Sequence, residues 1–209
     1  MTNHRPERAL RRLAPPRRAA EARARAAAAV LGDAAAARAL LDVAVWTAGS
    51  PIGDLLVAVT RKGLVRIAFA DEDRDLVLAE LAGAVGPRIL ESAAGTDEVR
   101  RELDQYFSGA RTRFNLGVDR RLIHGIARDV LAATRRVPFG STTTYGELAV
   151  KIGHPKAARA VGNALGSNPI PVVIPCHRVL RAGGALGGYA GGLTRKELLL
   201  ELEGALPRK

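Results

Sequence analysis

The chain has 209 residues, a formal net charge of +11 and a pI near 10.9. Its composition, 47% hydrophobic and 25% charged, excludes a disordered chain, and its single cysteine excludes disulfide frameworks and zinc sites that need two or more cysteines. No run of 18 apolar residues occurs, so no membrane-spanning helix is predicted. The positive charge favours nucleic acid or another anionic surface as the partner.

The charge is distributed unevenly along the chain. Residues 1–40 carry +6, residues 41–118 carry −3 and residues 119–209 carry +8. The first segment is rich in Ala and Arg, but its apolar stretch is too short for a secretory signal, and it fits a mitochondrial transit peptide only loosely. We predict that 1–40 is a helix-prone extension without chemistry of its own, followed by an α/β domain over 41–118 and a second domain over 119–209.

The first domain is predicted to be a small antiparallel meander with two helices. Short apolar runs bounded by turns indicate the strands, and apolar residues at helical spacing indicate the helices. The strands are expected over 42–47, 55–60 and 64–69, and the helices over 73–82 and 96–107.

The second domain is predicted to be mostly helical, so that the whole chain is α+β. Its helices are expected over 123–134, 144–152, 156–165 and 193–202, with Thr144 as the cap of the second. The two central helices, joined at His154-Pro155, form a helix-turn-helix pattern. The second of them is almost entirely Ala and Gly apart from Arg159, whereas a major-groove reader carries several polar side chains. This pattern favours a helix that approaches a narrow groove and inserts one long side chain.

The only cysteine lies in the segment Pro175-Cys176-His177-Arg178, after an apolar run over 172–174 that reads as a strand. A neighbouring imidazole or guanidinium lowers the pKa of a thiol and makes it reactive. The alternative is a buried small apolar residue, which is the common environment of a free cysteine. We favour a reactive Cys176 held in a stiff turn.

Two further features follow the cysteine. Six glycines within residues 183–192 indicate either a flexible loop or backbone that presses against a ligand, with Tyr189 as the only aromatic ring in the segment. The last predicted helix ends at Glu203-Gly204. Taken alone, Glu203 reads as a solvated residue at a helix end rather than as a catalytic carboxylate.

The order of these motifs closely resembles the O6-alkylguanine-DNA alkyltransferases, also called methylated-DNA–protein-cysteine methyltransferases. The resemblance covers about residues 136–204, and Ser50–Gly53 and Tyr106–Gly109 match the family's amino-terminal domain more weakly. The matching motifs are Phe139-Gly140, Tyr145–Ala149, Pro155–Gly162, Asn168-Pro169, Pro175–Arg178, Tyr189–Gly192 and Glu203-Gly204. Three positions depart from many relatives, which carry Gln near Arg128, Trp near Leu131 and Ser at Ala190. The change at Leu131 suggests that the core is repacked, and at Ala190 the backbone N–H donor is retained.

The resemblance implies a direct-reversal DNA repair enzyme that acts once. Cys176 would be the nucleophile that takes the alkyl group from O6-alkylguanine, and also from O4-alkylthymine. His177 would take the thiol proton through a water, Glu203 would orient the histidine, and Asn168 would brace the turn. The resulting thioether does not hydrolyse. No cofactor is expected, nor a metal, since the one cysteine is already assigned.

The resemblance also implies how DNA is bound. The partner would be double-stranded DNA carrying O6-alkylguanine, gripped through the minor groove with the damaged nucleotide flipped into a pocket. Arg159 would fill the space that the flipped nucleotide leaves in the duplex. Tyr145 would press against the phosphate next to that nucleotide. The remaining expected DNA contacts are Lys156, Ala157, Ala158, Ala160 and Arg178. The expected base pocket comprises Tyr145, Leu165, Pro171, Val179, Tyr189 and Ala190.

Three alternative functions remain. A module that binds alkylguanine without repairing it would replace the cysteine, which this chain retains. A transcription regulator would need base-reading side chains on its recognition helix, and a cysteine hydrolase has no use for an Ala/Gly helix. We therefore expect the repair enzyme, acting as a monomer in the bacterial cytoplasm in association with the nucleoid.

Overall fold

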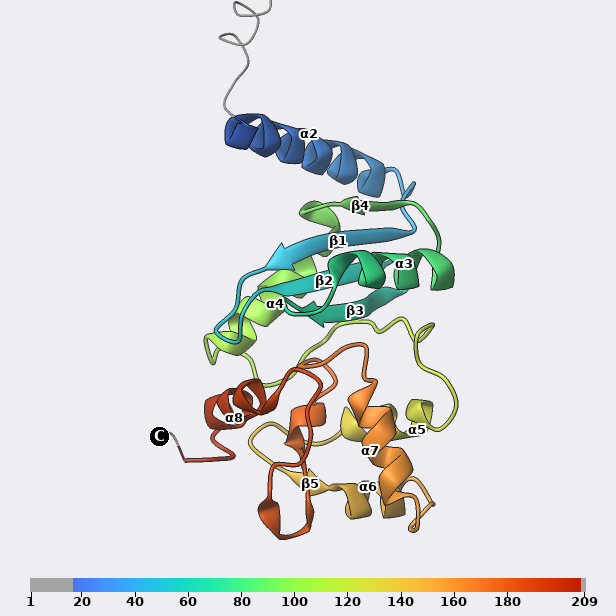
Figure 1. Ribbon diagram of the computed structural model, residues 1–209, viewed down its shortest axis with the longest axis vertical. Helices are drawn as coiled ribbons and strands as arrows, with labels where there is room; N and C mark the ends of the chain where they lie inside the picture. The colour runs from blue at the N-terminus through green and yellow to red at the C-terminus, as the bar shows by residue number, and fades with distance from the viewer. Residues whose placement is uncertain (1–16, 208–209) are drawn as a thin grey trace, which may run out of the picture.

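The computed structural model describes residues 17–207, and the part of the extension before Arg17 lies outside them. Figure 1 shows a four-stranded sheet flanked by helices in the upper half of the molecule and a mostly helical lower half. The α+β prediction is therefore confirmed. None of the described helices is long and apolar enough to cross a lipid bilayer.

The sheet has the strand order β3-β2-β1-β4. Its strands are β1 (Val43–Ala48), β2 (Leu55–Thr60), β3 (Gly63–Phe69) and β4 (Ile89–Glu91). The antiparallel meander of β1, β2 and β3 is confirmed within one residue at each end. The sequence did not indicate β4, which pairs parallel to β1, because three half-buried residues are too few to show alternation.

Alternating side chains of the strands pack on both faces of the sheet. One face packs Val43, Val45 and Val65 against Val77 and Leu81 of α3 (Arg74–Ala84). The other face packs against α4 (Asp97–Phe107) and continues into the lower half of the molecule. One hydrophobic core therefore joins the sheet to the helices below it.

The lower half contains the predicted helix-turn-helix. The helices and strands of this lower half are α5 (Ala127–Thr134), β5 (Thr143–Thr144), α6 (Tyr145–Lys151), α7 (Ala158–Gly166), β6 (Val179–Leu180) and α8 (Leu193–Leu202). The helix-turn-helix consists of α6 and α7. Thr144 caps α6 as predicted, and Glu147 completes a reciprocal capping box. The expected helix over 123–134 begins only at Ala127, because turns occupy residues 121–126.

Helix α2 (Arg17–Ala37) confirms that the extension is helix-prone. It lies beside β4 at the edge of the sheet (Figure 1). Asp33 accepts hydrogen bonds from Ser92 Oγ at 2.7 Å and from the Ala94 amide at 3.0 Å. Gly32 is buried against the strand, and a Cβ atom there would lie 1.8 Å from the Glu91 carbonyl oxygen. Helix α2 can therefore lie this close to β4 only because residue 32 is a glycine, which has no Cβ atom.

Replacing Gly32 with Ala is expected to displace α2 without unfolding the core. Trypsin should then cleave faster after Arg38, which follows the helix. Gly83→Ala is the matched control, because no atom lies within 4 Å of a Cβ atom at that helical position. It should be neutral or stabilise the protein by up to about 1 kcal/mol. Equal cleavage rates in both variants would contradict this account of the docking.

Candidate active site

Cys176 follows a tight turn rather than a strand. The run over 172–174 forms turns, and Val172 has a positive φ of 71°, so the prediction of a strand leading into the cysteine is wrong. Asn168 holds this turn: its Nδ2 donates to the Ile174 carbonyl at 2.9 Å and to Cys176 Sγ at 3.1 Å. Its Oδ1 accepts from the Ile170 amide at 3.0 Å. The chain conformation is therefore fixed on both sides of the thiol.

The thiol of Cys176 is buried, with 5% of the residue exposed. Burial raises its pKa to about 11, although the hydrogen bond from Asn168 and the charge of Lys196 act in the opposite direction. The sequence led us to expect that neighbouring cations lower this pKa, whereas burial acts in the opposite direction and is the larger effect. At neutral pH the resting site holds a protonated thiol, and a base must remove its proton.

His177 lies next to Cys176 in a short 3-10 helix (Cys176–Arg178) and is fully buried. Its Nε2 lies 2.9 Å from Glu203 Oε1, and burial lowers the pKa of the imidazole. A neutral ring beside an ionised carboxylate places its proton on Nε2. Nδ1 is then an acceptor, and it has no hydrogen-bond partner within residues 17–207.

Glu203 is buried at the end of α8, so the interpretation as a solvated cap residue is wrong. Its Oε1 accepts from Tyr106 Oη at 2.6 Å and from His177, and both carboxylate oxygens accept from Arg178 at 2.8 Å. Burial alone would raise the pKa of Glu203, but the hydrogen bonds from His177 and Arg178 lower it to about 2. The carboxylate therefore remains charged across the physiological range.

Tyr106 is a site residue that the sequence indicated only as part of the weak match over Tyr106–Gly109. It is fully buried on α4, and its hydroxyl reaches Glu203 from the sheet-containing half of the chain. Burial and the neighbouring carboxylate raise the pKa of Tyr106, so the hydroxyl stays a donor. Its place in the Tyr106–Gly109 motif was the only signal in the sequence.

Arg178 does not face solvent as a DNA contact would. Besides its bidentate pairing with Glu203, it donates to the Val137 carbonyl at 2.6 Å and lies 5.9 Å from the Phe139 ring centre. The residue is only 6% exposed. The expectation that Arg178 binds DNA is corrected by this position: its charge neutralises the buried Glu203.

A cavity of about 270 Å³ opens at Cys176. It is lined by Tyr145, Gly162, Leu165, Gly166, Cys176, Gly188, Tyr189 and Ala190. Pro171 instead lines a neighbouring cavity with Asn168, and Val179 lines neither. Both residues are buried, and their expected contact with the base stays a prediction.

Lys196 is a buried cation that the sequence analysis missed. Its Nζ donates to the carbonyls of Val179 at 2.6 Å and Gly188 at 3.4 Å, and also to that of Leu186. Burial lowers its pKa to about 8. These hydrogen bonds connect the glycine-rich segment, which lines the cavity, to the strand that follows the cysteine. In the sequence, a lysine within a helix gave no reason to expect burial.

The helix-turn-helix lies at the lower end of the molecule (Figure 1). Both of its helices contribute residues to the lining of the cavity. On α7 and the residues before it, Lys156, Ala158 and Arg159 are exposed, whereas Ala157 and Ala160 are partly buried. The same helix supplies Gly162, Leu165 and Gly166 to the cavity wall. One short helix therefore presents Arg159 at the surface and borders the pocket of Cys176.

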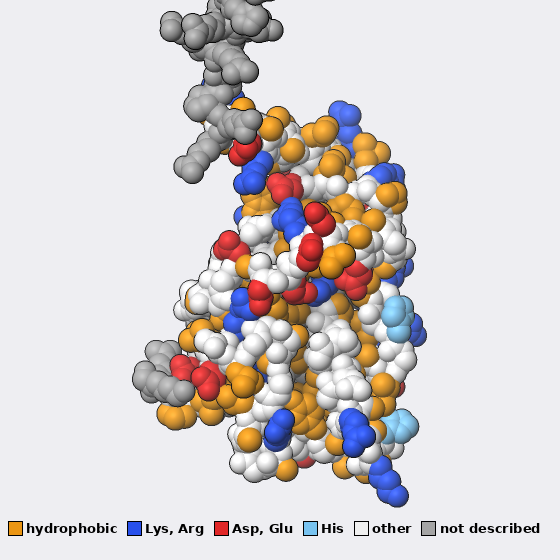
Figure 2. Space-filling view, viewed as in Figure 1, with side chains coloured by type: hydrophobic (Ala, Val, Ile, Leu, Met, Phe, Trp, Pro, Cys, Tyr) orange, Lys and Arg blue, Asp and Glu red, His pale blue; other side chains and the backbone are white. Residues whose placement is uncertain are grey.

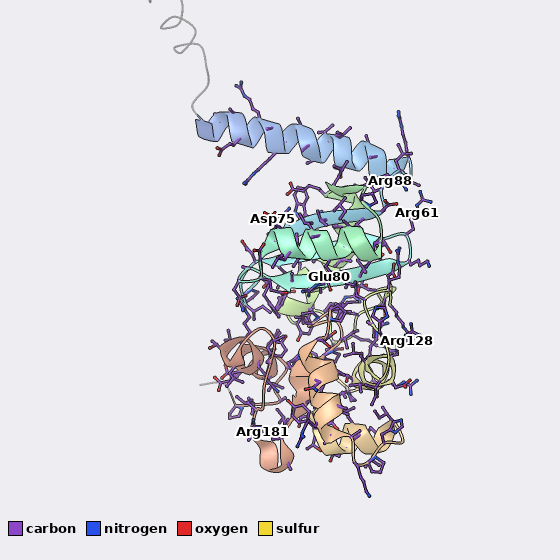
Figure 3. The ribbon with its side chains drawn as sticks, turned by 45° about the vertical axis from the view of Figure 1, so that its right-hand side comes forward. Arg61, Asp75, Glu80, Arg88, Arg128 and Arg181 are labelled. Carbon is purple, nitrogen blue, oxygen red and sulfur yellow. The ribbon has the colours of Figure 1, made fainter. Side chains whose placement is uncertain are left out.

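In Figure 2, most acidic side chains of this face lie over the upper half, interspersed with Lys and Arg, and Lys and Arg side chains also lie at the lower end. Figure 3 labels Asp75 and Glu80 on α3, and Arg181 on the loop at the lower end. The sequence analysis did not select Arg181, which is exposed and whose charge acts on Tyr145. The surface around the cavity is thus suited to an anionic partner.

The fold and the site define a thiol centre beside a helix-turn-helix, and the comparisons with known proteins identify the family. Residues 46–120 match the ribonuclease-like domain of 6-O-methylguanine DNA methyltransferase, and residues 125–205 match its DNA binding domain. The chain belongs to the 6-O-methylguanine DNA methyltransferase family.

Individual relatives agree with this assignment. The methylated-DNA–protein-cysteine methyltransferase of Methanosarcina acetivorans is 38% identical over 156 residues, which are 75% of this chain and 95% of that protein. The protein of the same name from Mycolicibacterium paratuberculosis is 41% identical over 157 residues, 75% of this chain and 90% of that protein.

Solved structures are similar as well. The crystal structure of Mycobacterium tuberculosis O6-methylguanine methyltransferase has a TM-score of 0.66 at 36% identity and covers 80% of this chain and 96% of its own. The crystal structure of Mycobacterium tuberculosis OGT in complex with DNA has a TM-score of 0.64 at 36% identity, covering 76% and 91% of the two chains.

The low pKa of Glu203 predicts a specific acid sensitivity. A carboxylate with a lowered folded-state pKa stabilises the fold above its unfolded value of 4.5 and loses this contribution as the pH falls toward 2. Urea unfolding across this range should show a loss on the order of 3 kcal/mol from this group. Glu203→Gln should be less stable at neutral pH and lose less on acidification. Glu98→Gln, at an exposed position of α4, should follow the unmodified protein. If the free energy of unfolding changed with pH in the same way for all three proteins, the lowered pKa of Glu203 would be contradicted.

Proposed function

We propose that this protein is a methylated-DNA–protein-cysteine methyltransferase that repairs O6-alkylguanine in DNA by direct transfer of the alkyl group to Cys176. The observation that carries the proposal is the position of this thiol: it lines a cavity beside α7 and adjoins the buried His177–Glu203 pair. Membership of the family and the DNA complex of the Mycobacterium tuberculosis relative support it.

The transfer is a displacement at the alkyl carbon. The sulfur of Cys176 forms a bond to that carbon, the bond from carbon to guanine O6 breaks, and its electron pair stays on the guanine. The thiol proton passes through a water to Nδ1 of His177, which is free to accept it, and the ionised Glu203 stabilises the imidazolium. The guanine then takes up one proton. Because the thioether does not hydrolyse, each protein acts once.

The cavity walls suit recognition of an extruded base. Tyr189 lines the cavity with a buried hydroxyl that has no hydrogen-bond partner within the described chain. Burial keeps its pKa well above the ordinary value, so the hydroxyl remains a donor. Ala190 contributes its amide toward the charge that develops on O6. Tyr145 closes the opposite wall and adjoins the surface on which DNA would lie.

DNA recognition completes the proposal. Duplex DNA carrying O6-alkylguanine, or O4-alkylthymine, would bind with its minor groove on α7 and flip the damaged nucleotide into the cavity. Arg159 would fill the vacated space, flanked by Lys156 and the small residues Ala157, Ala158 and Ala160. The small side chains support this role because they let the helix backbone approach the groove closely.

The remaining assignments belong to the same proposal. Residues 1–40 form an extension, 41–118 a first domain and 119–209 the domain that binds DNA and holds the thiol. One chain contains the whole site, which supports action as a monomer. Because the proposed substrate is genomic DNA, we propose that the protein acts in the bacterial cytoplasm, in association with the nucleoid.

Intact-mass measurement tests the transfer itself. After incubation with a duplex that carries O6-methylguanine, the protein should gain a single methylene mass of about 14 Da, because sulfur exchanges its proton for a methyl group. Cys176→Ala should show no gain. An unmodified protein that still binds the duplex would instead indicate a module that recognises the lesion without repairing it, and repeated turnover would indicate a hydrolase.

A second measurement tests the role of Arg159. Arg159→Ala should slow repair in duplex DNA at least 10-fold while leaving the reaction with free O6-benzylguanine unchanged, because only the duplex requires a residue to occupy the vacated space. Lys151→Ala, which removes one exposed cation from α6, is the control and should affect the duplex reaction far less. Equal losses on both substrates in Arg159→Ala would overturn this role.

A further inference from the structure

A second cavity, of about 790 Å³, lies between the segment that leads into α5 and the residues that follow α5. It shares no lining residue with the cavity at Cys176. Its walls include four arginines, Arg113, Arg120, Arg135 and Arg136, together with Phe114 and Phe139. None of its lining residues is acidic. The proposed repair reaction makes no use of these side chains.

The four arginines are exposed at the rim of the cavity. Some other arginines of the described chain pair with carboxylates, as Arg66 does with Glu72 and Arg121 with Asp119. The fifth arginine of the lining, Arg178, is neutralised by Glu203. Within residues 17–207, none of the four makes an ion pair.

Three of the four guanidinium groups, those of Arg113, Arg120 and Arg135, lie close enough for their like charges to act on one another. Arg135 donates to the Leu116 carbonyl at 2.7 Å, which holds it in the cavity wall. Burial lowers its pKa, and the like charges of Arg120 and Arg113 lower it further. Clustered cations without a carboxylate oppose folding, and a bound anion would relieve their repulsion.

We propose that this cavity binds an oligophosphate anion, a ligand with two or more linked phosphates. Arginine presents paired N–H donors that match phosphate oxygens, and several guanidinium groups facing one space suit more than one phosphate. The half-buried Phe114 and Phe139 add apolar surface next to the charges. The same chemistry is available from a free nucleotide and from the backbone of DNA, and the experiment separates these sources.

Calorimetric titration with inorganic tripolyphosphate tests the site directly. The unmodified protein should bind one tripolyphosphate per chain, and Arg113→Gln with Arg120→Gln should weaken binding at least 10-fold. The matched control is Arg23→Gln with Arg61→Gln, which removes the same charge at exposed positions outside the cavity and should bind like the unmodified protein. Equal affinities of the two double variants would overturn the proposal.

Thermal unfolding shows whether the double variant loses tripolyphosphate binding only because it is less folded. Without phosphate, the Arg113→Gln, Arg120→Gln variant should be at least as stable as the unmodified protein, because the repulsion on Arg135 is relieved. Tripolyphosphate should raise the Tm of the unmodified protein and the control but not that of the variant. A Tm increase of equal size in all three proteins would overturn the proposal.

Binding of undamaged duplex DNA at several salt concentrations identifies the source of the phosphates. If DNA fills the cavity, the variant should bind it more weakly, with a dependence of log affinity on log salt that is shallower by about two. If a free nucleotide is the ligand, only tripolyphosphate binding should change. Either result supports the anion site, and no change in both overturns it. Transfer from O6-benzylguanine should be unaffected throughout, so failure of this proposal is distinguishable from failure of the repair function.

Discussion

The buried carboxylate of Glu203 connects the parts of the molecule on which the site depends. It accepts hydrogen bonds from Tyr106 of α4, from His177 beside the thiol, and from Arg178, which in turn holds the Val137 carbonyl. A charge in this position is tolerated only because Arg178 neutralises it and the surrounding donors satisfy its oxygens. The sheet-containing half, the segment of the cysteine and the end of α8 are thereby fixed relative to one another.

This arrangement explains how the buried thiol can be protonated at rest and still be deprotonated for the reaction. Burial keeps Cys176 protonated, which protects the only thiol of the chain from unproductive chemistry. Asn168 sets the direction of the sulfur, and the neutral His177 offers an acceptor that the ionised Glu203 makes more basic. Under the proposed mechanism, His177 would activate the thiol as a positioned base at the moment of reaction.

The positive charge of the chain serves distinct purposes in different places. Arg178 and Lys196 are buried and hold backbone and carboxylate in place. Arg159 and Arg181 are exposed at the end that carries the helix-turn-helix. Within residues 17–207, the four arginines of the second cavity make no ion pair, and they line a cavity other than that of Cys176. A net charge of +11 therefore combines structural cations with cations available to bind anions.

The sequence by itself determined the strands of the meander, helix α8 and the cap at Thr144, because these depend on local periodicity and turn chemistry. It also indicated Cys176, His177 and Glu203 through a motif. Only the tertiary structure decided that Glu203 and Arg178 are buried together, that Tyr106 joins them, and that Lys196 holds the wall of the cavity. Burial and long-range pairing depend on which segments pack together, and this information is absent from the local pattern around each residue.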